Sequence, residues 1–138
     1  MTSTLLLLAA LAFYAAGSAA ALVSLLRRSE RGPRLALWIM SAGFVVHTAY
    51  IGTICSRTGH PPLTNLHETV IFLAWLLFGV ELILNLRFRV RAAGFFVYPM
   101  VLMLLTIGVA VGEHALPLES EFVSALFIAH LLLSTVGI

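Results

Sequence analysis

Five long stretches with almost no charge decide what this chain can fold into. They span residues 4–26, 35–55, 69–86, 92–112 and 122–138. About 20 apolar residues let a helix cross a bilayer, and inside lipid only helices or closed barrels satisfy their own backbone hydrogen bonds. With 61% hydrophobic residues and a mean hydropathy of +1.05, this chain cannot hide its apolar surface as a soluble domain. We predict one all-α transmembrane domain over residues 1–138, a bundle of about five helices in the lipid bilayer.

The last apolar stretch has 17 residues and runs to the end of the chain. No charged residue or aromatic anchor follows Leu131, whereas spanning helices usually finish with one. We therefore expect the sequence to be truncated at its C-terminus. The alternative is a short final helix that ends inside a complex.

The basic residues predict how the bundle is oriented. All eight are arginines, and seven of them lie in two short connections, RRSERGPR and RFRVR. Short arginine-rich loops stay on the cytoplasmic side, so the N-terminus and the connections 56–68 and 113–121 are predicted to lie outside. The formal charge of +2 is too small, and the arginines are too clustered, for a nucleic-acid partner.

Two histidines fall inside the apolar stretches, His47 in the second and His130 in the fifth. Each lies eight residues, or about 12 Å, from the outer end of its predicted helix. An ionisable group at this depth marks a candidate functional site, and paired axial imidazoles can hold a haem iron. If the two helices are neighbours, both histidines could share one iron. The alternative for His47 is a hydrogen bond to a carbonyl or to a hydroxyl such as that of Thr48 or Thr53 on a nearby helix.

The connection before the third stretch, TGHPPLTNLHET, is unusually polar for a membrane loop. Two adjacent prolines stiffen it and exclude helix there. Either Thr64 or Asn65 can cap the helix that follows, with Glu68 in the first turn, where negative charge suits the helix dipole. The histidines of the outer connections are expected to be solvated: His60, His67 and His114.

Four further residues are candidates for a ligand or for packing. Arg57 could pair with a carboxylate, since guanidinium pairs well with such groups. Phe72 and Trp75 could line the edge of a planar ligand, or Trp75 could anchor its helix at the interface. Glu81 is expected to reach toward the inner arginines. The small residues of AAGSAAA, at 15–21, predict that the first helix packs closely inside the bundle or against a partner.

The stretch GHPPLTNLHETVIFLAW resembles the signature of the cytochrome c assembly family, the CcsA/CcmC-type haem-handling membrane proteins. The aromatic residue that often precedes the family's glutamate is His67 here. His130, in FIAHLLLSTVGI, resembles the family's next landmark, an axial haem ligand at the outer face. The positions that match the signature are Gly59, Pro62, Asn65, Glu68, Phe72 and Trp75.

This resemblance implies a component of cytochrome c biogenesis in the bacterial plasma membrane that presents haem b at the outer face. The implied partners are a second cytochrome c assembly subunit and apocytochrome c. His130 would bind the haem iron, as would His47 from its depth in the bilayer. Five further residues would line the cofactor site: Arg57, His67, Glu68, Phe72 and Trp75.

The family's tryptophan-rich WWD segment is missing, so the chain resembles only the N-terminal half of such proteins. Alone it is not expected to be catalytic, although it could be part of a cytochrome c haem lyase. One alternative is a relative without the WWD segment that acts as a membrane regulator or assembly factor for haem synthesis. Another is a small accessory subunit of a respiratory complex.

Overall fold

The computed structural model describes residues 2–29, 31–59, 61–88, 91–112 and 133–134 of the chain. In this part it contains four long helices: α1 (Thr2–Leu26), α2 (Gly32–Thr58), α3 (Leu66–Phe88) and α4 (Arg91–Val111). Each is long and apolar enough to cross a membrane. The prediction of an all-helical chain with membrane-spanning helices is confirmed for these four. The predicted fifth helix, 122–138, lies outside the described residues apart from 133 and 134.

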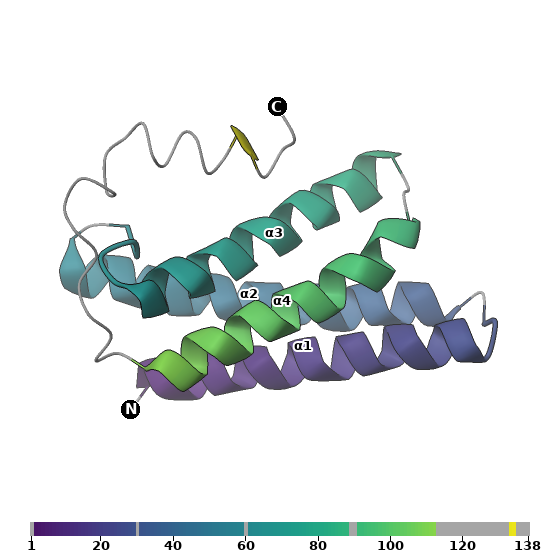
Figure 1. Ribbon diagram of the computed structural model, residues 1–138, viewed down its shortest axis with the longest axis horizontal. Coiled ribbons are helices and arrows are strands. Elements are labelled where there is room, and N and C mark those ends of the chain that lie inside the picture. The colour runs from purple at the N-terminus through teal and green to yellow at the C-terminus, as the bar shows by residue number, and fades with distance from the viewer. Residues whose placement is uncertain (1, 30, 60, 89–90, 113–132, 135–138) are drawn as a thin grey trace.

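Successive helices run in opposite directions and lie side by side (Figure 1). Within the described residues, α1 packs most extensively against α2, α3 packs most extensively against α4, and α4 also crosses α1. We call one end of the bundle the arginine end, because α1 ends there at Leu26, α2 begins at Gly32 and α3 ends at Phe88, next to the two arginine-rich connections. We call the other end, where α2 ends at Thr58 and α3 begins at Leu66, the histidine end, because it holds His67. The two arginine-rich connections therefore share one end. That this end faces the cytoplasm remains a prediction.

The close approach of α1 and α2 depends on glycines. A Cβ atom at Gly43 would lie 2.8 Å from the Cβ of Phe13, and one at Gly17 would lie 2.6 Å from the Cγ of Met40. Small residues let helix backbones approach closely in lipid, where water does not drive association. Gly17 lies within the small-residue stretch 15–21, so the prediction that this segment packs inside the bundle agrees with the structure.

Two predicted helices are too short at both ends, by two or three residues at each end. The second helix was expected over 35–55 but spans Gly32–Thr58, because Pro33 suits a first helical turn and the helix ends at Gly59. Gly59 has φ 75°, and its N–H donates to the carbonyl of Cys55 at 2.9 Å. The third helix was expected over 69–86 but spans Leu66–Phe88.

Candidate functional site

The first turn of α3 is held by a reciprocal set of hydrogen bonds. The side-chain oxygen of Asn65 accepts from the backbone N–H of Glu68 at 2.8 Å, so Asn65 is the N-cap. The Glu68 carboxylate in turn accepts from the backbone N–H of Thr64 at 3.1 Å and from its hydroxyl at 2.6 Å. This arrangement resembles a capping box. It explains why α3 begins three residues earlier than predicted.

His67 is buried and joins three helices, in contrast to the solvated loop residue expected from the sequence. It is 4% exposed. Its Nδ1 lies 2.6 Å from the carbonyl oxygen of Gly108 on α4, and its Nε2 lies 3.2 Å from the hydroxyl of Tyr50 on α2. A carbonyl only accepts, so Nδ1 donates, and in the neutral ring Nε2 accepts from the Tyr50 hydroxyl. Both ring nitrogens are therefore engaged within the bundle.

A cavity of about 260 Å³ lies beside His67 at the histidine end, lined by six residues of α2, α3 and the connection between them. It brings together three predicted site residues, Arg57, His67 and Glu68. Pockets for drug-sized ligands usually measure about 300–1,000 Å³. This cavity thus has room for part of a ligand, such as a carboxylate group beside Arg57, but not for a whole porphyrin.

The predicted aromatic residues form a stack outside this cavity. The ring of Trp75 stacks with Phe44 of α2, with centroids 5.4 Å apart, and with Phe72, with centroids 5.6 Å apart. Its Nε1 donates to the hydroxyl of Thr48 at 2.9 Å. Neither Phe72 nor Trp75 lines the cavity that holds Arg57. In the structure, this stack joins α2 to α3. Contact of Phe72 or Trp75 with a planar ligand stays a prediction.

His47 is wholly enclosed, at 0% exposure, in the middle of the bundle. Its Nδ1 lies 3.2 Å from the hydroxyl of Tyr14 on α1. The sequence-based alternative, a hydrogen bond to a hydroxyl on a nearby helix, agrees with this contact. The residues named for it are wrong, because Thr48 and Thr53 lie on α2 itself and bond to carbonyls of that helix. The Nε2 of His47 has no partner among the described residues.

The geometry of the described residues does not by itself assemble a haem site. His67 has no free nitrogen, and the Nε2 of His47 faces packed protein with no exposed surface. The main predicted ligand, His130, lies outside the described residues, as do His60 and His114. The sharing of one iron by His47 and His130 therefore stays a prediction.

Glu81 does not reach the arginines as expected. It is 2% exposed, and one carboxylate oxygen accepts from the side-chain amide of Asn85 at 3.3 Å. The other oxygen has no partner among the described residues. Asn85 lies one turn further along α3, so the hydrogen bond of this carboxylate lies within its own helix and leaves one buried oxygen unpaired among the described residues.

Sequence reasoning missed the partners that hold the buried histidines. Tyr14 and Tyr50 are almost completely buried, and their hydroxyls face His47 and His67. A buried tyrosine hydroxyl usually finds a hydrogen-bond partner, so a tyrosine within an apolar span is a detectable signal. The carbonyl of Gly108 offers no such signal, because every residue carries one.

Comparison with known proteins gives one informative similarity. A 74-residue part of the chain, 54% of its length, is 28% identical to Protein HemX of Bacillus subtilis (strain 168). The matched part amounts to 27% of HemX, so the similarity spans about a quarter of that protein. No family profile matches the chain, and no solved structure matches it. The name HemX associates that protein with haem and does not refer to cytochrome c.

Proposed function

We propose that the protein is a multi-pass component of the haem pathway in the plasma membrane, acting as a regulator or assembly factor without synthase activity. The observation that carries the proposal is the similarity to HemX. The bonding of His67 supports it, because both ring nitrogens of this histidine are occupied in holding helices together. A regulator or assembly factor acts through contacts with other proteins. It does not need a histidine that is free to bind a haem iron.

Deletion of the gene tests this proposal when haem supply and haem attachment are measured separately. We expect altered porphyrin precursors and total haem, with c-type and b-type cytochromes changing in parallel. Haem added to the medium should restore both classes. Loss of c-type cytochromes alone, unrelieved by added haem, would overturn the proposal.

That contrary result would favour the second candidate, cytochrome c biogenesis with haem b held at the outer face. The match of Gly59–Trp75 to the assembly signature supports this candidate. It would place Arg57 opposite a haem propionate, and it would require a second assembly subunit and apocytochrome c as partners.

A pair of arginine variants separates the two candidates in the purified protein. Arg57 lines the cavity at the histidine end, whereas Arg27 is exposed at the arginine end. Each variant, Arg57→Gln and Arg27→Gln, removes one positive charge. Under the proposed function, added haem binds both variants and the parent chain equally. A selective loss of about fivefold in Arg57→Gln, equivalent to one charge contact of about 1 kcal/mol, would favour the second candidate.

A further inference from the structure

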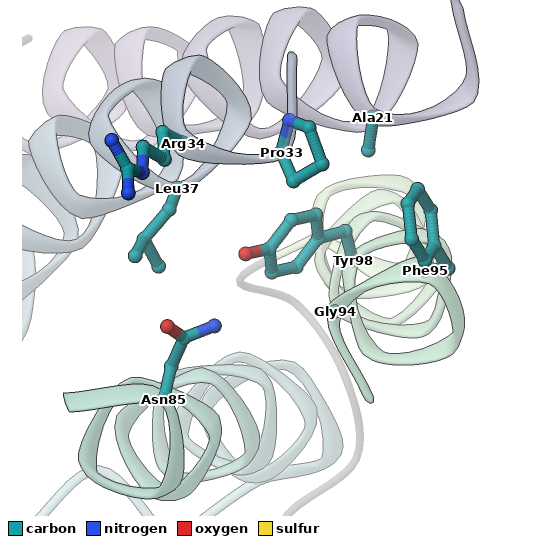
Figure 2. A pocket seen from close by; sticks show the side chains of 8 residues that line it. All are labelled: Ala21, Pro33, Arg34, Leu37, Asn85, Gly94, Phe95 and Tyr98. Atoms are coloured by element: carbon teal, nitrogen blue, oxygen red, sulfur yellow. The ribbon is translucent and has the colours of Figure 1, made fainter. Parts of the chain in front are cut away.

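A cavity of about 310 Å³ opens between all four helices at the arginine end. Figure 2 shows the hydroxyl of Tyr98 and the amide of Asn85 pointing into it from α4 and α3. The Tyr98 side chain is 4% exposed, and its hydroxyl reaches the cavity. A phenol hydroxyl can both donate and accept, so it offers the cavity a polar group for a ligand.

The charge of the cavity favours an anion. Arg34 is the charged residue that lines it, and Arg27 and Arg87 are exposed at the same end of the bundle. Glu81 does not line the cavity, although it lies near enough to Tyr98 to interact with it electrostatically. The side-chain amide of Asn85 donates to one of the Glu81 oxygens. A guanidinium, a phenol hydroxyl and an amide are all donors, which suits the oxygens of a phosphate group.

An apolar groove of about 600 Å³ adjoins this cavity along α1 and α4. The two share Ala21 and Phe95 in their walls. Along α1 the groove reaches from Ala15 to Leu25, which at 1.5 Å per residue is about 15 Å. A polar, positively charged pocket that continues into a long apolar groove has the shape and chemistry of one amphiphile with an anionic head.

We propose that this composite site binds one anionic phospholipid, with its phosphate in the Arg34–Asn85–Tyr98 cavity and an acyl chain in the α1–α4 groove. Basic pockets between transmembrane helices are known to hold anionic headgroups on the cytoplasmic side, the side predicted for this end. Gly94 keeps the cavity in its present form, because a Cβ there would lie 2.7 Å from the Cζ of Tyr98. The occupant is a lipid and not a free phosphate, since the groove supplies most of the available contact area.

The purified full chain in detergent tests this proposal by titration with three probes, counted as molecules bound per chain by native mass spectrometry. The probes are dioleoyl phosphatidylglycerol, dioleoyl phosphatidylcholine and glycerol 3-phosphate. We expect one phosphatidylglycerol to bind about fivefold or more tightly than phosphatidylcholine, as one arginine contact supplies. Equal binding of the two lipids overturns the proposal. Competition by glycerol 3-phosphate at equal concentration also overturns it, because the tail would then contribute nothing.

Matched variants locate the site. Arg34→Gln should remove the preference for phosphatidylglycerol, whereas Arg27→Gln, with the same charge change outside the cavity, should keep it. Ala19→Leu, which fills the groove from its lipid-exposed wall, should weaken binding of both lipids. Equal loss in both arginine variants indicates a diffuse surface field and refutes the site. If Arg34→Gln fails to fold by circular dichroism, Tyr98→Phe tests the same cavity by removing only the hydroxyl.

Discussion

Replacing His67 with phenylalanine should destabilise the bundle by about 2 kcal/mol, at nearly constant ring size. Interhelical hydrogen bonds in membrane bundles average about 0.6 kcal/mol and reach about 1.7 kcal/mol. The short bond to the Gly108 carbonyl belongs near the upper value, and the longer one to Tyr50 near the average. The Gly108 carbonyl still accepts from the N–H of Gly112 at 3.3 Å, so the variant does not add the full cost of an unpaired carbonyl.

The assay is reversible unfolding in mixed detergent and SDS micelles, followed by far-UV circular dichroism. A double-mutant cycle with Tyr50→Phe should return a coupling of about 0.6 kcal/mol between the two side chains. Ser56→Ala is the control, because that exposed hydroxyl bonds only to its own helix, and its effect should stay within about 0.5 kcal/mol. Parent-like stability of His67→Phe together with a zero coupling would refute the structural role assigned to His67.

Substitutions at three further contacts test the bundle by the same unfolding measurement. Gly43→Ala places a methyl group 2.8 Å from the Phe13 Cβ and should cost about 1–3 kcal/mol through overpacking; an unchanged midpoint would mean that α1 and α2 lie further apart. Asn65→Ala removes the N-cap of α3 and should cost about 1 kcal/mol, while Asn65→Asp, which can still cap, should keep most of that stability. Trp75→Phe keeps a stacking ring but loses the bond to Thr48, so about 0.6 kcal/mol should be lost, with no further loss when Thr48→Val is added.

The helices could be predicted from the sequence because lipid imposes a simple length rule on apolar stretches. Their ends were harder to place, because they depend on single residues. The αL conformation of Gly59 ends α2 just after Thr58, and the side chain of Asn65 starts α3 before the apolar run begins. In both cases a local hydrogen bond decides the boundary, and hydropathy does not report it.

The site was only partly predictable, because its contacts join residues far apart in the chain. The polar character of the stretch around His67 was evident, and Arg57 and Glu68 do share a cavity with it. The burial of His67 could not be foreseen, since its acceptor is a backbone carbonyl 41 residues away. The partner of His47 was missed for a related reason, because helix neighbours must be known before Tyr14 can be considered.

The bond between His67 and Gly108 also has a consequence for the order in which the protein is made. The ribosome adds about 5–20 residues per second, so the acceptor emerges roughly 2–8 s after the imidazole. The hairpin of α1 and α2 involves only residues already synthesised, and it can close during this interval. The first turn of α3 lacks its strongest link to another helix until α4 arrives. The first turn of α3 is therefore fixed against the bundle only after α4 has inserted. In nascent chains halted before Gly108, His67 should be accessible to water-soluble reagents.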